Sequence, residues 1–159
     1  VNLINQGNFK EAIALLKKNE SKYNDKYEIY FNLGLCYMSI GETFNALKAY
    51  AKSVSLNPND PINLNSFGAL LQETGNLKKS KLVFEEAIRL KPDYADAYNN
   101  LGLYYKTILN YDKAVHYFKQ ATNFDKNHYL AINNLALIVF MLLRIIGVQL
   151  KIQWFKFAD

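Results

Sequence analysis

The sequence predicts an all-α fold, a right-handed superhelical solenoid of antiparallel helix hairpins, because one period of 34 residues runs along most of the chain. Glycines, small residues and prolines each recur at this spacing. The three series are Gly34, Gly68 and Gly102; Ala12, Ala46, Ser80 and Ala114; and Pro58 and Pro92. Independent series with one period indicate a repeated structural unit that hides its apolar face against its neighbours.

The elements expected in chain order are a partial repeat, three full repeats and an incomplete repeat that together form an array over residues 1–142. The partial repeat occupies 1–26 and contributes a second helix at about 7–24. The full repeats are 27–60, 61–94 and 95–128, and the incomplete repeat begins at 129. We expect first helices at 27–40, 61–74, 95–108 and 129–142, and second helices at 43–56, 77–90 and 111–124.

Helical spacing and turn chemistry justify these elements. Tyr30, Leu33 and Tyr37 form one apolar stripe on the first helix of a repeat. A glycine in mid-helix costs about 1 kcal/mol relative to alanine, so its recurrence indicates that a neighbouring helix must approach closely. Gly41 and Gly75 fall where a left-handed residue would end the first helix.

Composition argues against several classes of function. Half of the 159 residues are hydrophobic and 21% are charged, which is a globular balance. The net charge of +5 comes from scattered lysines without an arginine-rich block, so we expect no nucleic-acid partner. The lone cysteine, Cys36, fits a reducing compartment, and we expect a cytoplasmic protein.

No pattern of catalytic or metal-ligating residues stands out. His116 and His128 have no cysteine or carboxylate at ligand spacing, which indicates ordinary surface or packing histidines. No nucleophile elbow, phosphate loop or zinc-protease motif occurs. We therefore expect no enzymatic activity, no cofactor and no metal.

The repeated pattern resembles the tetratricopeptide repeat family over about residues 7–142. The resemblance implies that the first helices line a concave surface that binds peptides. Asn32, Asn100 and Asn134 occupy one repeat position, with Ser66 between them, and this row is similar to the asparagine ladder of O-linked N-acetylglucosamine transferase arrays. Spaced amides can pair with the backbone of an extended peptide. The predicted peptide-binding residues are Asn32, Leu35, Asn65, Ser66, Asn99, Asn100, Leu103, Asn133 and Asn134.

The leading hypothesis is a protein-interaction scaffold that binds a peptide or a helical segment of a partner. A carboxylate clamp like that of chaperone adaptors is not expected, because the matching positions lack cations. They hold Phe31, Leu35, Ser66 and Asp96, with Asn100 where the family places the arginine. The alternative is the recognition arm of a larger enzyme, such as a glycosyltransferase, with its catalytic domain outside this piece. A third hypothesis is self-association through the terminal hairpins.

The tail at 143–159 departs from the repeat pattern. Residues 135–143 are continuously apolar, and Arg144 to Gly147 replace the expected turn. Three interpretations stay open at this point: a membrane-spanning helix, a hydrophobic cap folded back on the last hairpin, and a shift of reading frame near residue 138. A membrane span is the least favoured, because the uninterrupted run is shorter than the ~20 residues a span needs.

Overall fold

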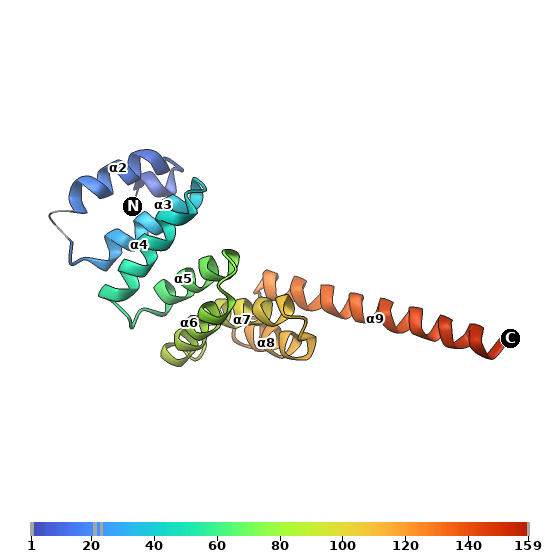
Figure 1. Cartoon of the computed structure of the whole chain (residues 1–159). Coiled ribbons are helices and arrows are strands. Elements are labelled where there is room, and N and C mark those ends of the chain that lie inside the picture. The colour runs from blue at the N-terminus through green and yellow to red at the C-terminus, as the bar shows by residue number, and fades with distance from the viewer. Residues whose placement is uncertain (1, 21, 23, 159) are drawn as a thin grey trace. The chain divides into compact units, whose positions relative to one another are not determined.

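The structure is a computed structural model that describes residues 2–20, 22 and 24–158. The chain divides into two compact units, residues 1–92 and 93–159. Every regular element in the described residues is an α-helix, which confirms the all-α helical-hairpin fold (Figure 1).

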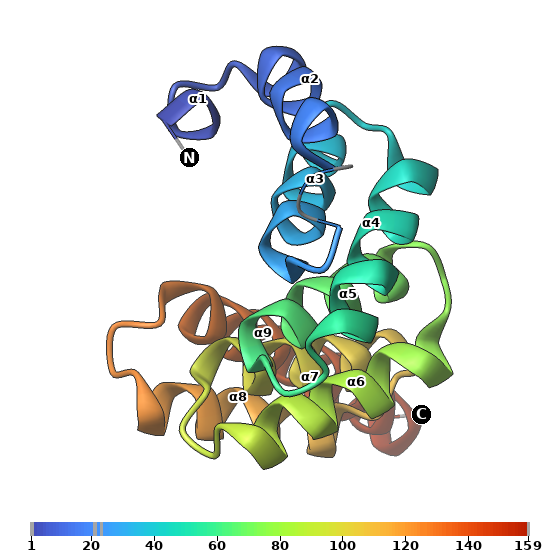
Figure 2. The same ribbon diagram turned by 90° about the vertical axis from the view of Figure 1, so that its left-hand side faces the viewer.

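The first unit holds six helices among its described residues, and those that follow one another in the chain pack together (Figures 1 and 2). The short α1 leads into α2, and α3–α4 and α5–α6 form two antiparallel hairpins. The bounds are Asn2–Asn5 for α1, Phe9–Glu20 for α2, Tyr27–Ser39 for α3, Thr43–Leu56 for α4, Pro61–Glu73 for α5 and Leu77–Leu90 for α6.

The second unit consists of one hairpin and one long helix. Helices α7 (Ala95–Thr107) and α8 (Tyr111–Phe124) pack as a hairpin, and α9 (Tyr129–Ala158) packs against α8. The sequence predicted a helix over 129–142, but α9 continues for 30 residues without a turn. Residues 143–148 are all exposed, so this segment does not fold back on the last hairpin as a cap.

Each recurring glycine packs against an aromatic ring on the second helix of its own hairpin. A Cβ atom built on Gly34 would lie 2.8 Å from the Tyr50 ring, and one built on Gly102 would lie 2.5 Å from the Phe118 ring. Because both rings are almost wholly buried, the first helix can approach its partner only where a side chain is missing. The glycines therefore recur because the two helices of each hairpin are in close contact at these positions.

Left-handed residues end the first helices, as the sequence predicted for Gly41 and Gly75. Their φ angles are +77° and +81°, and Gly7 has the same conformation before α2. The equivalent residue after α7 is Leu109, with φ of 60°. A leucine in this conformation carries a steric cost that glycine avoids, so the turn persists there without its preferred residue.

Buried small residues let adjacent helices pack closely, with one polar exception in the first unit. Ser53 of α4 donates a hydrogen bond to the Tyr27 carbonyl, and Asn63 of α5 donates to the Ser53 hydroxyl over 2.8 Å. The equivalent pair in the second unit is Ala121 and Ala131, both wholly buried. A hydrogen-bonded polar pair thus replaces two alanines at one helix crossing, and the Asn63 Oδ1 atom has no partner.

Candidate functional site

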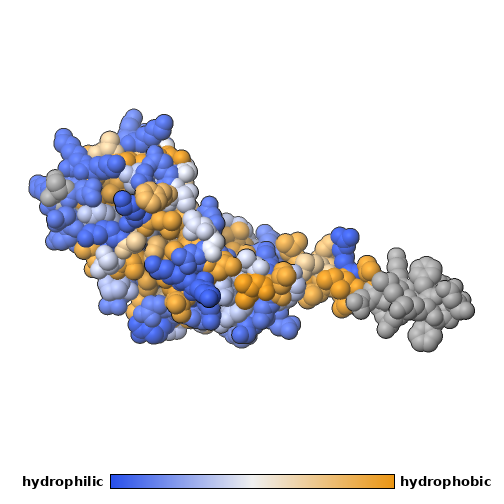
Figure 3. All heavy atoms as spheres, viewed as in Figure 1, coloured by the Kyte–Doolittle hydropathy of each residue, from blue (hydrophilic) through white to orange (hydrophobic). Residues whose placement is uncertain are grey.

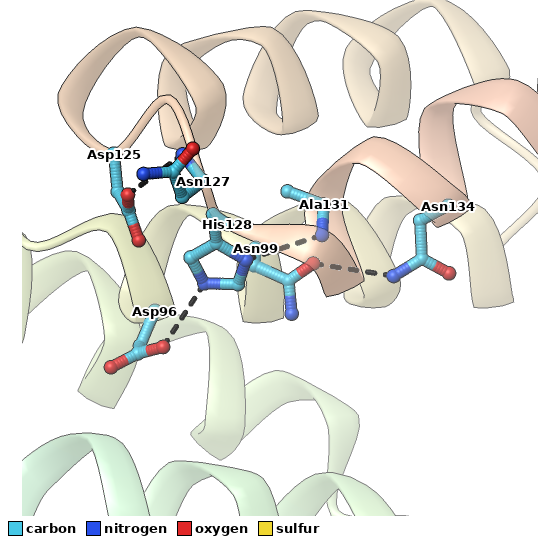
Figure 4. A network of polar contacts seen from close by, with 7 residues as sticks. All are labelled: Asp96, Asn99, Asp125, Asn127, His128, Ala131 and Asn134. Atoms are coloured by element: carbon cyan, nitrogen blue, oxygen red, sulfur yellow. Dashed lines mark hydrogen bonds and ion pairs between the residues drawn. The ribbon is translucent and has the colours of Figure 1, made fainter.

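Two predicted binding residues of the second unit, Asn99 of α7 and Asn134 of α9, form a connected polar chain with Lys106. The Asn134 amide donates to Asn99 Oδ1 over 3.2 Å, and Lys106 Nζ donates to Asn134 Oδ1 over 3.4 Å (Figure 4 shows the Asn99–Asn134 contact). These bonds join the first helices of consecutive repeats. The Asn134 side chain is therefore held in place by both an amide and a cation.

A histidine fixes the start of α9 beside this chain. His128 is buried, its Nδ1 atom accepts a hydrogen bond from the Ala131 backbone over 3.2 Å, and its Nε2 atom lies 3.0 Å from Asp96 Oδ1 (Figure 4). Since Nδ1 accepts, the proton of the neutral ring sits on Nε2 and is donated to Asp96. His128 therefore caps the first turn of α9 and ties it to the start of α7.

This pairing was missed at the level of sequence. Asp96 and His128 are 32 residues apart, which matches no local ligand or capping motif. The only available signal was the repeat itself, because residues nearly one period apart lie side by side on successive repeats. His128 is thus more than an ordinary packing histidine, since both ring nitrogens have defined roles.

In the first unit, the predicted residues at the asparagine position bond to their own helices. Asn32 donates to the Glu28 carbonyl over 2.8 Å, and Ser66 donates to the Ile62 carbonyl over 3.0 Å. Both side chains are half-buried. These bonds orient the side chains along the helix surface.

The nine predicted residues divide by exposure. Asn65 and Asn99 are 9% and 4% exposed, so they can support a binding surface but offer little of it themselves. Asn133 is exposed. The half-buried members, which can both pack and contact a ligand, are Asn32, Leu35, Ser66, Asn100, Leu103 and Asn134.

The described residues contain no group of three histidine, cysteine or carboxylate side chains close enough to hold a metal ion. Cys36, the lone thiol, is wholly buried, and burial raises its pKa. Burial also raises the pKa of the Tyr50 hydroxyl. A buried thiol with a raised pKa is poorly suited to act as a nucleophile.

Helix α9 exposes apolar side chains around most of its circumference. Leu137, Phe140 and Leu143 are each about 60% exposed. Figure 3 shows hydrophobic surface along the part of this helix that is coloured. Tyr129–Val148 has a mean hydropathy of 2.1, and by length and composition alone it could cross a membrane. The side chains of 149–159, including the tail aromatics Trp154 and Phe157, lie outside the described part of the structure.

Family models match most of the helical hairpins. A model described as tetratricopeptide repeat matches residues 27–60, a second with that description matches 95–128, and a TPR repeat model matches 68–107. The chain contains tetratricopeptide repeats. The recurring glycine Gly34 lies inside one of these matches, and Gly102 lies inside the other two.

Relatives and solved structures carry the same repeats. Photosystem I assembly protein Ycf3 of Rippkaea orientalis is 32% identical over 107 residues, which are 58% of this chain and 60% of that protein. The crystal structure of MamA superposes with a TM-score of 0.78 at 26% identity, covering 86% of this chain and 80% of that one. YrrB, described as a TPR protein with an unusual peptide-binding site, gives a TM-score of 0.76 at 25% identity and covers 82% and 68%.

The chain matches only part of the relatives, and their names describe proteins that act in assemblies. The chain spans about 60% of the length of the Ycf3 relatives and 27% of a BBSome complex member BBS4 homolog from Drosophila melanogaster. The relatives' names describe assembly proteins and members of complexes, which supports a protein-interaction scaffold. The finer likeness to O-linked N-acetylglucosamine transferase arrays stays a prediction from the asparagine row.

Proposed function

We propose that this protein is an interaction scaffold that holds a segment of a partner protein on its first-helix surface. In the second unit this surface lies on α7 and α9 and centres on Asn100, Leu103 and Asn134. An extended peptide or a helix would lie across these helices, with its polar groups on the amides and its apolar side chains against Leu103. No catalytic step is part of this function.

The polar chain between Asn99, Asn134 and Lys106 is the observation that carries the proposal. It holds an amide of α9 in a fixed orientation against α7, the helix that also carries the half-buried Leu103. A preorganised donor and acceptor loses less conformational freedom when a ligand binds than a mobile side chain does. The same feature would let the surface pair with the backbone of a peptide, as in the asparagine ladders that the sequence resembles.

The relatives add independent support for a protein ligand. YrrB is described as having a peptide-binding site, and Ycf3 is an assembly protein. For the present chain, the proposal specifies the chemistry of the partner segment. The chemistry of the surface favours a segment that combines apolar side chains with accessible backbone groups.

The test removes the Asn100 and Asn134 amides and measures how much of a partner protein the chain still retains. The full chain is immobilised, and proteins retained by it are quantified against those retained by the double variant Asn100→Ala with Asn134→Ala. We expect a specific partner to be lost from the double variant, because the surface then lacks its oriented amides. Circular dichroism checks that the variant keeps the helix content of the parent.

The matched control removes two exposed amides of the same unit, Asn123→Ala with Asn127→Ala. The control should retain the partner at the parent level. Equal retention by the parent and the Asn100/Asn134 variant would contradict the proposed surface. Equal loss in both double variants would also contradict it, since the effect would then not depend on position.

A further inference from the structure

A cleft lies in the first unit, on a different face of the repeats from the first-helix surface. It has a volume of about 350 Å³ and is lined by residues of α2, α3 and α4. Figure 2 shows these three helices near the N-terminal end of the chain. The buried Tyr30 and Tyr37 of α3 form its floor. The residues on α3 that were predicted to bind peptide, Asn32 and Leu35, do not line it.

Three lysines border this cleft, and two of them lie over its aromatic floor. Lys17 Nζ is 5.7 Å from the centre of the Tyr37 ring, and Lys52 Nζ is 5.9 Å from the centre of the Tyr30 ring. Lys48 is the third. Cation–π attraction at these distances biases Lys17 and Lys52 toward the cleft, whereas Lys48 Nζ lies 5.4 Å from the centre of the Phe44 ring outside it. We call this feature the lysine cleft.

One acidic residue moderates the positive charge of the lysine cleft. Glu20 lies on its border, so the lining carries three positive charges and one negative charge. A hydrogen bond to Tyr37 raises the pKa of Lys17, with a smaller contribution from Glu20. Burial, and then Glu20, raise the pKa of Tyr30, which keeps this hydroxyl protonated. The cleft thus offers ammonium and hydroxyl donors at neutral pH.

The next repeat in the same unit shows that the fold does not require this chemistry. One period after the three lysines the chain has Ala51, Leu82 and Glu86. One period after the two tyrosines it has Leu64 and Leu71. The hairpins form in both places, but in the second one leucines replace the two tyrosines, and the lysine over an aromatic ring there is Lys79 over Phe67.

We propose that the lysine cleft binds an acidic peptide segment. Carboxylates of the segment would pair with Lys17, Lys48 and Lys52, and an apolar side chain between them would rest on the Tyr30–Tyr37 floor. The cleft volume falls within the range of small ligand sites, about 300–1,000 Å³. This site is independent of the first-helix surface, because it uses another face of α3 and the second helices α2 and α4.

The experiment measures fluorescence anisotropy of a fluorescein-labelled peptide of alternating glutamate and leucine, titrated with the full chain. We expect saturable binding that weakens as salt is added, since the contacts are exposed ion pairs. The double variant Lys48→Gln with Lys52→Gln should bind roughly fivefold or more weakly, because it loses two exposed ion pairs. Replacing both lysines by arginine should keep the binding.

Two controls make the result specific to the cleft. Lys18→Gln with Lys78→Gln removes the same charge from exposed lysines of the same unit that do not line the cleft, and it should bind like the parent. Glu20→Gln should bind more tightly, because it removes the opposing charge. A labelled peptide of alternating glutamine and leucine should not bind measurably.

Several outcomes would overturn the lysine cleft. They are absence of saturable binding by the parent, equal weakening in both double lysine variants, and weaker binding by Glu20→Gln. Because the Lys48/Lys52 variant leaves Asn100 and Asn134 intact, it should retain the partner of the first-helix surface at the parent level. Failure of one site is therefore distinguishable from failure of the other.

Discussion

Helices α7 and α9 share one sequence pattern in the second unit, but they bury it to different extents. Tyr105 of α7 is 6% exposed, whereas its equivalent Val139 on α9 is 46% exposed. Gly102 is buried beneath the Phe118 ring, whereas its equivalent Ala136 is exposed. The apolar stripe of a first helix is thus buried by the second helix of its hairpin. Among the described residues, no second helix packs on the apolar stripe of α9.

The difference begins where the first helix should end. At Leu109 the backbone adopts φ of 60°, and Asn110 caps α8 by accepting a hydrogen bond from the Lys113 backbone over 3.1 Å. One period later the chain has Leu143 and Arg144, and α9 continues. Neither pair of positions contains glycine, so the clearer difference is the capping asparagine at 110. Its side chain pairs with a backbone donor that would otherwise stay unpaired.

The comparison shows that an amphipathic stripe and a turn signal are separate requirements. A chain that keeps the stripe but loses the turn still forms a helix, since apolar residues such as Leu, Ile and Met are compatible with one. Such a helix exposes its apolar residues. In α9 that exposed surface exceeds what isolated surface leucines produce, and it marks a contact site or an aggregation hazard.

The largest expected effect comes from adding a methyl group at the helix contact. Gly102→Ala should lower the free energy of unfolding, because overpacking costs about 1–3 kcal/mol and the Phe118 ring is wholly buried. This cost exceeds the gain in helix propensity of about 1 kcal/mol. Urea denaturation followed by circular dichroism measures the change.

Gly147→Ala is the matched control on α9. No atom outside its own helix lies within 4 Å of a Cβ atom at this position, so only the propensity gain remains and helicity should rise slightly. Opposite signs at the two glycines would sharpen the contrast between α7 and α9. A stabilised Gly102→Ala variant would contradict the proposed contact.

The next effect concerns the first turns of α7 and α9. His128→Ala should destabilise the start of α9 by about 1 kcal/mol, because the Ala131 N–H loses its acceptor. His128→Asn should recover most of the loss, since asparagine is also a capping acceptor.

Tyr94, at the equivalent position before α7, forms no side-chain cap, so Tyr94→Asn tests whether a cap added there stabilises α7. Thermal denaturation of the four proteins, parent included, distinguishes these cases, and an unchanged His128→Ala variant would exclude the cap.

A smaller effect tests the two turn positions. Leu109→Gly should raise the free energy of unfolding by about 0.5–1 kcal/mol, since glycine adopts positive φ without the steric cost. Little burial is lost, because Leu109 is 70% exposed. Leu143→Gly should instead weaken α9 by about 1 kcal/mol, as glycine does inside a helix. Equal effects of the two substitutions in urea denaturation would contradict the difference in backbone conformation.

The smallest effect on stability comes from a cysteine placed on α9 as a probe. Val139→Cys adds an exposed thiol, while Cys36 is wholly buried and burial raises its pKa. At neutral pH an aromatic disulfide reagent should therefore modify position 139 rapidly and Cys36 only after unfolding. Rapid modification of both thiols in the folded protein would show that the core around α3 is open.

Much of the fold was predictable because the repeat carries redundant signals. The glycine period, the apolar stripe and the left-handed turns at Gly41 and Gly75 all point to the same hairpins. The extension of α9 beyond residue 142 was not predictable from these signals. Periodicity indicates where a turn should occur, but the missing cap after Leu143 had to be weighed against an apolar run that favours a helix.

The candidate site was predictable only in outline. The repeat register placed Asn99, Asn100 and Asn134 on first helices, but burial of Asn99 and its bond to Asn134 depend on packing between neighbouring helices. The contact between His128 and Asp96 likewise depends on the third dimension. The lysine cleft was hidden because Lys17, Lys48 and Lys52 are scattered along the sequence and look like solvated residues.

Hydrogen exchange of the full chain, followed by mass spectrometry, tests the central claim most directly. Backbone amides of α7 between residues 98 and 107 should exchange far more slowly than those of α9 between 139 and 148, because a second helix covers only the former. Equal protection of the two segments would contradict the account, since it would mean that α9 is covered as fully as a helix inside a complete repeat.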